Sequence, residues 1–413
     1  MAAPHAGADD AGQAAVINSD AEITAGNMGE FALVHYSEIY LKGGNRGRFE
    51  RMLASNVAKA LGDSASRAVA ADGRIIAKLA ENADLEKAGR RLSLIPGIAN
   101  FSFAESAPLE MDVIRKAALA LVKKSDSPTF KVFTSRSNKR FPLDSHGVDC
   151  ALGDAVVESL GKKVDVHKPG LILHVEICEK NAFLYADRRA GAGGLPVGSS
   201  GRLVCSLSGG LDSPVAAFMM MKRGCEVTFA HAHNSTIGST GVKGKLERIV
   251  SALTEAQLTS KLYIVPFEKL QRQVIACVPS PMRMILYRRA MMRVMNGVAK
   301  LERCKGVVTG DSVGQVASQT LENLDCIYRA SELPVFAPLA GMNKSETVDI
   351  ARRIGTYEAS IVQSPDCCSF MIAKHPETRA RPREIEALEA NIPVRELAEE
   401  AVAKSEILEF EAK

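Results

Sequence analysis

The segment from Leu203 to Gly224 constrains the fold of this chain more than any other part of it. An apolar run, Leu203-Val-Cys-Ser-Leu207, breaks into the turn Ser208-Gly-Gly-Leu-Asp-Ser213, and a helix-like run begins at Pro214. The small residues of the turn leave backbone N–H groups accessible beside a helix N-terminus, where an anion such as phosphate can bind. Pro214 suits the first helical position, which needs no N–H donor. The sequence therefore predicts a phosphate-binding loop between a strand and a helix.

This loop lacks the lysine of the common Gly-x-x-x-x-Gly-Lys-Ser/Thr phosphate loop. The nearest imitation elsewhere, Gly241-Val-Lys-Gly-Lys245, has the wrong spacing for that motif. The Ser-Gly-Gly-x-Asp-Ser pattern is instead similar to the loop of pyrophosphatase-type enzymes, which cleave ATP between its α- and β-phosphates. The similarity implies adenylation of a substrate oxygen.

Composition limits the class of protein. The chain has 413 residues, of which 46% are hydrophobic and 24% charged, as is usual for two or three cored domains. Its apolar stretches are too short to span a bilayer, and its N-terminus lacks the plan of a signal peptide. Nine cysteines, scattered along a long chain, favour reduced thiols over a disulfide framework. We therefore expect a cytoplasmic enzyme with no membrane contact.

The formal charge is only +4, but the basic residues are clustered, whereas residues 1–28 contain no Lys or Arg. Such clusters are typical of a protein that binds a polyanion. The affinity gained from counterion release depends on local groups of basic residues rather than on net charge. Solvated helix faces are the alternative for any one cluster. The clusters are Arg46, Arg48 and Arg51; Lys131, Arg136, Lys139 and Arg140; Arg283, Arg288, Arg289 and Arg293; and Lys374, Arg379, Arg381 and Arg383.

The chain divides into segments of different character. Residues 1–29, rich in Ala, Gly and Asp, are interpreted as a disordered tail. Two small α/β domains follow at 30–104 and 105–190. The Gly-rich segment 191–201 is interpreted as a linker that separates domains and does not pack into a core. Residues 202–413 form the last domain, where short apolar strands alternate with helices and predict a parallel sheet with its ligand at the carboxyl ends of the strands. From Arg383 onward we expect one or two helices.

Several motifs occur in one order along the chain: Tyr36-Ser-Glu-Ile-Tyr-Leu-Lys-Gly-Gly-Asn-Arg46, Ser137-Asn-Lys-Arg-Phe-Pro142, Gly193-Gly-Leu-Pro-Val-Gly198, the Ser208 loop, Thr309-Gly-Asp-Ser-Val-Gly-Gln-Val-Ala-Ser-Gln-Thr-Leu-Glu-Asn323 and Ile354-Gly-Thr-Tyr357. Together they resemble the tRNA 4-thiouridine synthetase family, which thiolates uridine 8 of tRNA and in many organisms serves thiamine thiazole synthesis. The resemblance implies an α/β fold with an N-terminal ferredoxin-like domain at 30–104 and a THUMP domain at 105–190. A Rossmann-like parallel-sheet PP-loop ATP pyrophosphatase domain at 202–413 would follow them.

The resemblance also implies roles for single residues. It places ATP, with Mg²⁺, against Ser206, Leu207, Ser208, Gly209, Gly210, Ser213, His231, Ala232, Arg288, Gly310 and Gln319. Asp212 would hold Mg²⁺ or order the loop, and Lys344 would stabilise charge on the α-phosphate. Without the resemblance, Lys344 is interpreted as a surface lysine and His231 as a core histidine. Gly310 is then a turn residue and Gln319 a residue on a helix surface.

The pair Cys367-Cys368 aligns with the catalytic cysteine of the family. The thiolate is the reactive form of cysteine, and Lys374, His375 and Arg379 would favour it if they fold nearby. Cys368 is preferred as the persulfide carrier, and Cys367 is the near alternative. A buried structural role is the competing interpretation. Adjacent cysteines do not readily form a relaxed disulfide with each other, so the resolving thiol stays open.

The expected activity is ATP-dependent adenylation of uridine 8, followed by replacement of O4 with persulfide sulfur. Lys139 and Arg140 would contact the tRNA. A cysteine desulfurase would donate the persulfide, the thiazole sulfur-carrier protein is a further candidate partner, and a homodimer is left open. The chain stops near Lys413 and contains no Cys-x-x-Cys, so we expect neither a rhodanese domain nor an iron–sulfur cluster. Two alternatives remain: a PP-loop enzyme that adenylates a different acceptor, and a non-catalytic tRNA-binding protein.

Overall fold

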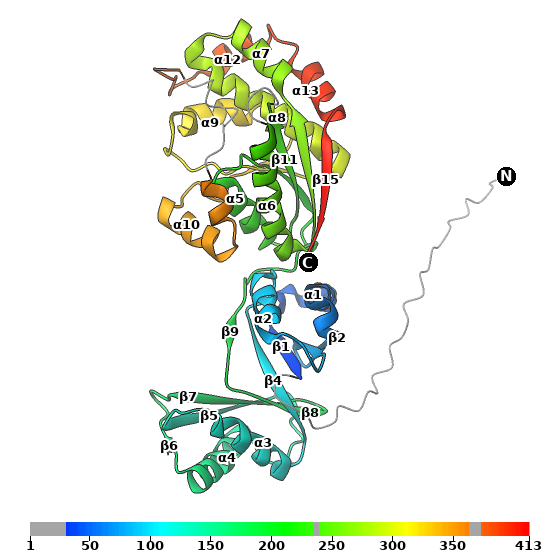
Figure 1. Ribbon diagram of the computed structural model, residues 1–413, viewed down its shortest axis with the longest axis vertical. Coiled ribbons are helices and arrows are strands. Elements are labelled where there is room, and N and C mark those ends of the chain that lie inside the picture. Colours follow the sequence, from blue (N-terminus) through cyan, green and yellow to red (C-terminus); the bar gives the residue numbers. More distant parts are fainter. Residues whose placement is uncertain (1–29, 235–238, 363–372, 413) are drawn as a thin grey trace, which may run out of the picture. The chain divides into compact units, whose positions relative to one another are not determined.

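The computed structural model describes residues 30–234, 239–362 and 373–412 (Figure 1). The tail at residues 1–29 and the pair Cys367-Cys368 therefore lie outside the described residues. One compact unit is formed by residues 106–184, and the rest of the described chain on either side of it forms the other. Among the described helices, none combines the length and the apolar character that a bilayer crossing requires.

Residues 30–105 fold as four antiparallel strands with two helices. Strand β1 pairs with β3 on one side and β4 on the other, which gives the order β2-β3-β1-β4. Leu53, Val57 and Leu61 of α1 are fully buried, as their helical spacing predicts. The elements are β1 (Phe31–His35), η1 (Glu38–Asn45), α1 (Arg46–Leu61), η2 (Gly62–Ser64), β2 (Ala65–Ala71), β3 (Arg74–Leu79), α2 (Leu85–Leu94) and β4 (Asn100–Pro108).

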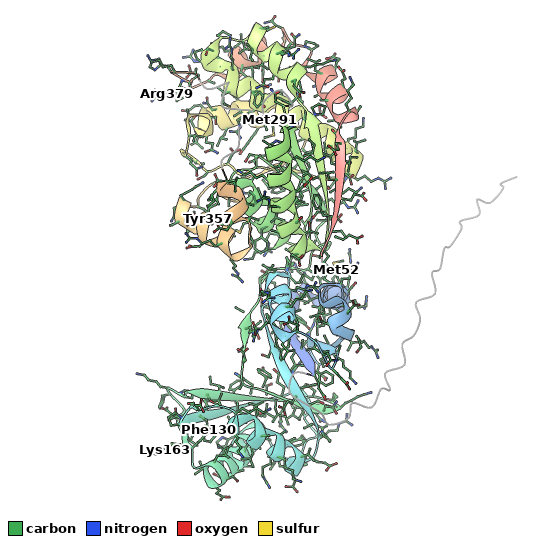
Figure 2. The ribbon with its side chains drawn as sticks, viewed as in Figure 1. Met52, Phe130, Lys163, Met291, Tyr357 and Arg379 are labelled. Carbon is green, nitrogen blue, oxygen red and sulfur yellow. The ribbon has the colours of Figure 1, made fainter. Side chains whose placement is uncertain are left out.

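The unit 106–184 combines two helices with a short sheet. Strand β5 pairs in parallel with β6 and with β7, and β8 lies next to β7. The side chain of Asp144 caps the N-terminus of α4 by accepting a hydrogen bond from the Gly147 N–H. Phe130, labelled in Figure 2, is fully buried in this unit. The elements are α3 (Met111–Lys123), β5 (Thr129–Arg136), α4 (Ser145–Leu160), β6 (Lys163–Val164), β7 (Leu171–Ile177) and β8 (Asn181–Tyr185).

Residues 202–412 are built on one six-stranded sheet of order β14-β13-β10-β11-β12-β15. The first five strands are parallel, so their carboxyl ends share one edge. The strands are β10 (Arg202–Ser206), β11 (Glu226–His233), β12 (Thr259–Pro266), β13 (Val307–Val308), β14 (Val335–Phe336) and β15 (Glu406–Glu411); the two-residue β9 (Arg189–Ala190) pairs instead with β4.

Helices cover both faces of this sheet. Val204 points into one core and its neighbours Leu203 and Cys205 into the other, as successive strand residues must. Figure 2 labels Met291, which packs against the first core, and Tyr357, which packs against the second. The first core contains residues of α7 (Glu268–Cys277), α8 (Arg283–Glu302), α9 (Leu321–Tyr328), α12 (Pro382–Glu389) and α13 (Val394–Ala403); the second contains residues of α5 (Asp212–Met221), α6 (Ser239–Gln257), α10 (Lys344–Arg353) and α11 (Tyr357–Ile361).

The end of the chain differs from the expectation of helices alone. After α12 and α13, the chain forms β15, which pairs antiparallel with β12 at the edge of the sheet. Leu408 and Phe410 pack against the core that contains α5 and α6, while Ile407 is half exposed. This period of two is the pattern of an edge strand, and the acidic residues between the apolar ones masked it.

The expectation that segment 191–201 does not pack is also wrong. Leu195 is 4% exposed, and Ala192 and Val197 belong to the core that contains α5 and α6. The N–H of Leu195 donates to the carbonyl oxygen of Lys222 at 2.9 Å. Gly194 has φ +79°, and a Cβ placed on it would lie 2.0 Å from that same oxygen. Glycine is therefore required at 194 by close backbone contact as well as by its dihedral angle.

Substitution of two adjacent glycines tests this interpretation. G193A places alanine at φ +74° in open space, so we expect a loss of about 1 kcal/mol in unfolding free energy. G194A adds a clash with a backbone carbonyl, and we expect a loss of about 3 kcal/mol. Urea denaturation of the two variants and the wild type measures both values. Equal losses in the two variants would contradict a packed role for the segment.

Candidate functional site

The glycine turn runs from the end of β10 at Ser206 to the start of α5 at Asp212 and is closed by hydroxyl groups. The Ser208 N–H donates to Ser213 Oγ at 3.0 Å, and the Gly210 N–H donates to Ser208 Oγ at 3.2 Å. Gly209 adopts φ +74°, which favours glycine. Two of the N–H groups expected to face an anion thus bond within the loop. Pro214 is the third residue of α5 rather than the first, still within the turn that needs no N–H donors.

Gly310, two residues after β13, lies directly against this junction. A Cβ on Gly310 would meet Ser213 N at 2.7 Å and the carbonyl carbon of Asp212 at 2.9 Å. These are backbone atoms of the first turn of α5, so they cannot move aside as a flexible side chain would. Glycine at 310 lets the end of β13 approach the N-terminus of α5, which explains the residue better than a simple strand-end turn does.

Asp212 joins the loop to two distant segments. Lys344 Nζ donates to Asp212 Oδ1 at 2.6 Å, and Gln315 Nε2 donates to Asp212 Oδ2 at 3.0 Å. Lys344 is the first residue of α10, which is fixed by a capping box between Asn343 and Glu346. The Lys344 side chain is 53% exposed and that of Asp212 is 21% exposed, so the pair lies at the surface of the site. The structure therefore brings together Lys344, predicted to stabilise charge on the α-phosphate, and Asp212, predicted to hold Mg²⁺ or to order the loop.

His231 and Ala232 belong to β11, the strand beside β10. His231 is 6% exposed, and its Nδ1 lies 2.7 Å from the carbonyl oxygen of Leu207. Since a carbonyl can only accept, Nδ1 carries the hydrogen and donates. Leu207 also donates its N–H to the carbonyl oxygen of Ala230 at 2.9 Å. The histidine thus fixes the backbone at the point where the loop leaves the sheet.

Arg288 and Gln319 meet on a buried carboxylate, Asp311. Arg288 Nη2 donates to both carboxylate oxygens of Asp311 at 2.6 and 2.7 Å, and Gln319 Nε2 donates to Oδ1 at 3.0 Å. Tyr328 donates its hydroxyl to Oδ2 at 2.8 Å. Within the described part of the chain, the buried Gln319 Oε1 has no hydrogen-bond partner. That oxygen can accept from an N–H or O–H group of a ligand.

The charge of Asp311 follows from these contacts. Burial raises its pKa, but the Arg288 charge and the hydrogen bonds from Arg288, Gln319 and Tyr328 lower it, and the net pKa lies below 3.8. Burial and the Asp311 charge both raise the pKa of the Tyr328 phenol, which therefore stays protonated and donates. Asp311 is thus a carboxylate at neutral pH, and the guanidinium of Arg288 is held by it rather than free in solution.

The remaining predicted residues lie elsewhere. Lys139 and Arg140 follow β5 in the unit 106–184, where both are exposed. Arg140 Nη2 lies 3.3 Å from Glu179 Oε2, but 90% of its side chain is accessible. An arginine this exposed keeps most of its donors for an external anion. Cys367 and Cys368 lie outside the described residues, so their roles stay predictions.

Three residues of the site were missed by sequence reasoning. Asp311 and Gln315 lie within the motif from Thr309 to Asn323, and the position of Asp311 three residues after a strand was an unused signal. Tyr328 lies on α9, outside every motif. Its contact with Asp311 spans 17 residues and depends on how α9 packs.

Comparison with known families gives three matches along the chain. Residues 31–102 match the ThiI ferredoxin-like domain, 109–187 match the THUMP domain, and 198–394 match the family described as thiamine biosynthesis protein (ThiI). The predicted order of a ferredoxin-like, a THUMP and a PP-loop domain in an α/β chain is confirmed.

Individual relatives align over nearly their whole length. A "Probable tRNA sulfurtransferase" of Moorella thermoacetica is 42% identical over 92% of this chain and 97% of its own. One of Caldanaerobacter subterraneus subsp. tengcongensis is also 42% identical, over 86% of this chain and 93% of its own. The crystal structure of a 4-thiouridine synthetase–RNA complex with bound ATP superposes with a TM-score of 0.85 at 35% identity, covering 92% of this chain and 99% of that chain.

The substitution Asp311→Asn tests the buried ion pair. At pH 7 we expect a loss of about 3–5 kcal/mol in unfolding free energy, because the variant leaves the Arg288 charge without its carboxylate. Because the folded pKa of Asp311 lies below the unfolded one, this contribution is present above pH 3.8 and is lost as pH falls through the folded pKa. Denaturation at pH 7, 5 and 3 measures the difference between wild type and variant.

The control is Asp325→Asn, which removes an exposed pair with Arg329 on α9 and should leave stability unchanged. A wild-type advantage over D311N that grows between pH 5 and pH 3 would contradict the assigned sign.

Proposed function

The chain belongs to the ThiI family, the tRNA 4-thiouridine synthetases, and we propose that it adenylates uridine 8 of tRNA and replaces O4 with sulfur. The observation that carries this proposal is the contact of Asp212 with Lys344 at the mouth of the Ser208–Ser213 loop. It places a carboxylate and an ammonium beside a helix N-terminus that lacks the lysine of kinase-type loops. This is an arrangement suited to reaction at the α-phosphate.

ATP is the proposed nucleotide. Phosphate oxygens would bind at the Ser208–Ser213 loop and the first turn of α5, and Gln319 Oε1, which has no partner among the described residues, suits the amino group of adenine. The solved relative that contains RNA and ATP supports this choice of ligands. Ser206, Leu207, Ser208, Gly209, Gly210, Ser213, His231, Ala232, Arg288, Gly310 and Gln319 are the proposed ATP-binding residues.

Mg²⁺ fits Asp212. This ion takes one or two carboxylates together with phosphate oxygens, and Asp212 supplies one carboxylate with 21% of its side chain exposed. Among the described residues, no three His, Cys, Asp or Glu side chains are grouped so that they could hold a metal ion. Phosphate oxygens would therefore have to supply further ligands to Mg²⁺. The bound ion would neutralise phosphate charge, and Asp212 would share its oxygens between Lys344, Gln315 and the ion.

Adenylation transfers AMP to the base. Uridine O4 would bond to the α-phosphorus while the bond between the α-phosphorus and the bridging oxygen breaks, so that pyrophosphate leaves with the electron pair. Lys344, held beside the loop by Asp212, would bond an α-phosphate oxygen as charge develops there. Arg288 uses one Nη on Asp311 and the other on the Ser318 carbonyl oxygen at 3.3 Å, and its N–H groups that are not used in these bonds would serve phosphate.

Sulfur transfer would use a persulfide on Cys368, with Cys367 as the near alternative. The terminal sulfur attacks C4 of the adenylated uridine, AMP leaves, and a mixed disulfide joins the cysteine to the base. A second thiol then attacks the cysteine sulfur, which releases 4-thiouridine and leaves a disulfide between the two thiols. A cysteine desulfurase would load the persulfide, and the same persulfide could serve the thiazole sulfur-carrier protein.

The tRNA would be bound by the first two domains, proposed here as residues 30–104 and 105–190, ahead of the catalytic domain at 202–413. Lys139 and Arg140 are exposed and carry the positive charge that a phosphate backbone attracts. A homodimer is compatible with this scheme but is not required by the residues of the site.

Asp212→Ala tests the adenylation step. We expect formation of AMP and pyrophosphate from ATP and tRNA to fall by about 100-fold or more, because Lys344 loses its partner and the α-phosphate its positioning group. The measurement is tRNA-dependent release of labelled AMP and pyrophosphate. Asp325→Ala, on the surface of α9, is the control and should keep wild-type activity. Wild-type formation of ADP and orthophosphate in place of AMP would refute the proposal.

Cysteine variants test the sulfur step separately. Cys368→Ala should leave pyrophosphate release unchanged while 4-thiouridine falls below detection, because only the persulfide carrier is lost. Mass spectrometry of tRNA nucleosides gives the readout, and Cys277→Ala, at an exposed cysteine of α7, is the control. Loss of thiolation in C367A alone would move the role to Cys367. Thiolation that persists in both single variants would eliminate the persulfide mechanism.

A further inference from the structure

The segment that joins β13 to α9 exposes two apolar side chains beside the candidate site. Val313 is 46% exposed and Val316 is 52% exposed. Both belong to the motif from Thr309 to Asn323, and no step of the proposed mechanism uses them. One exposed valine is ordinary at a protein surface. What distinguishes this pair is the way in which the residues around it contact the rest of the site.

Polar side chains of the segment bond to other parts of the site. Ser312 Oγ donates to the carbonyl oxygen of Met342 at 3.3 Å, and Gln315 Nε2 donates to Asp212 Oδ2 at 3.0 Å. Ser312 and Gln319 are less exposed than the valines that lie between them. This is the reverse of the usual preference, in which polar side chains are the exposed ones. The two valines are therefore open to a ligand that prefers apolar contact.

Backbone hydrogen bonds fix the conformation of the segment. The Val313 N–H donates to the carbonyl oxygen of Ala340 at 3.3 Å, the Gly314 N–H to that of Gln319 at 2.9 Å, and the Gln319 N–H to that of Val316 at 2.8 Å. Gly314 has φ +75°, which favours glycine. A surface that is ordered before its ligand arrives loses less conformational entropy on binding.

The valines lie next to the groups proposed to act in adenylation. Gln315, which stands between them in the chain, bonds the Asp212 carboxylate that also accepts from Lys344 at 2.6 Å. Consecutive Cα atoms are about 3.8 Å apart, so the backbone of Val316 is a direct neighbour of that contact. Met342, bonded by the other end of the segment, precedes Lys344 by two residues. The exposed valines thus adjoin the place where an acceptor would meet the α-phosphate.

The charge of the segment indicates which part of a substrate it suits. Residues 312–319 contain no Asp, Glu, Lys or Arg, so they offer nothing to attract or to repel phosphate. An enzyme that acts on an atom of a base takes that base out of its stack, and the base then needs new contacts for its faces. Apolar side chains supply such contacts. A neutral, planar nucleobase therefore fits this surface better than the RNA backbone does.

We propose that Val313 and Val316 bind the uracil that is adenylated and hold it at the Asp212–Lys344 pair. This inference rests on the proposed adenylation, which it deepens by assigning a surface to the acceptor base. The valines make van der Waals contact with the uracil, which leaves O4 free to bond to the α-phosphorus. They contribute no proton and no charge, so their effect is on the position of the base in the reacting complex.

The double variant V313S/V316S tests this role. Both positions are exposed, so we expect the fold and the affinity for ATP to stay as in the wild type. Affinity for tRNA should stay within about twofold, because the first two domains are proposed to bind its phosphates. The single-turnover rate of pyrophosphate release with tRNA should fall about 10-fold or more, which is the size of a lost base contact. Calorimetry with ATP, filter binding with tRNA and rapid-quench kinetics give these values.

Two variants serve as controls. V313I/V316I keeps apolar side chains at both positions and should retain most of the wild-type rate. Leu301→Ser replaces an apolar residue that is 60% exposed near the end of α8. The segment just after it reaches the amino end of β10, where the Lys305 N–H donates to the carbonyl oxygen of Arg202 at 2.8 Å. This substitution, at the opposite edge of the sheet, should leave the rate unchanged.

Crosslinking locates the base without relying on turnover. The probe is tRNA that carries 4-thiouridine at position 8, whose thiocarbonyl bonds covalently to a contacting amino acid under near-ultraviolet light. We expect the crosslink within residues 312–319. Trypsin cleaves after Lys305 and Arg329, so this segment lies in the single peptide 306–329. Fragment-ion mass spectrometry of that peptide assigns the residue.

The outcomes separate this inference from the proposed function. A wild-type rate in V313S/V316S overturns the role of the valines, and so does a crosslink confined to other segments. Equal losses of ATP and tRNA affinity with a lowered melting temperature also overturn it, since they are the signature of packing residues. If the wild type forms ADP with tRNA but crosslinks within residues 312–319, the adenylation proposal fails and the base-binding surface stands.

Discussion

The ion pair between Asp212 and Lys344 joins the two halves of the site, and its geometry depends on the parallel sheet. Asp212 is placed by β10 and the glycine turn, whereas Lys344 is placed by α10, 132 residues later. The two meet because the carboxyl ends of β10, β13 and β14 share one edge of the sheet. The close backbone contact of Gly310 with Ser213 then sets how near the segment after β13 can come to α5.

The features that the sequence predicted are local ones. The turn from Ser208 to Ser213 can be predicted because glycine, serine and aspartate at this fixed spacing are typical of few other structures. The spacing of Leu53, Val57 and Leu61 likewise predicts a helix, and all three residues are buried on α1. The roles of Asp212 and Lys344 needed the family resemblance, since a lysine that opens a helix is by itself no signal for catalysis. Their contact in space supports what the motifs alone could only align.

The features that the sequence did not reveal depend on contacts between distant segments. Strand β15 is fixed by β12, and its acidic residues hide the alternation of Leu408 and Phe410. The packing of Leu195 and Val197 follows from where α5 ends, which no property of the glycine-rich segment indicates. Tyr328 is a donor to Asp311 only because α9 packs beside the segment after β13. In each case the role of the residue depends on the distant segment that it contacts. Residue type alone does not identify that segment.

The charge at the N-terminus of α5 is balanced by a residue from a different part of the chain. In loops that carry Gly-Lys, the lysine at the helix N-terminus serves the outer phosphates. Here Asp212 starts that helix, and a lone carboxylate would repel phosphate oxygens at this position. With Lys344 at 2.6 Å the pair is close to neutral, so the N-terminus of α5 can meet a phosphate group without that repulsion.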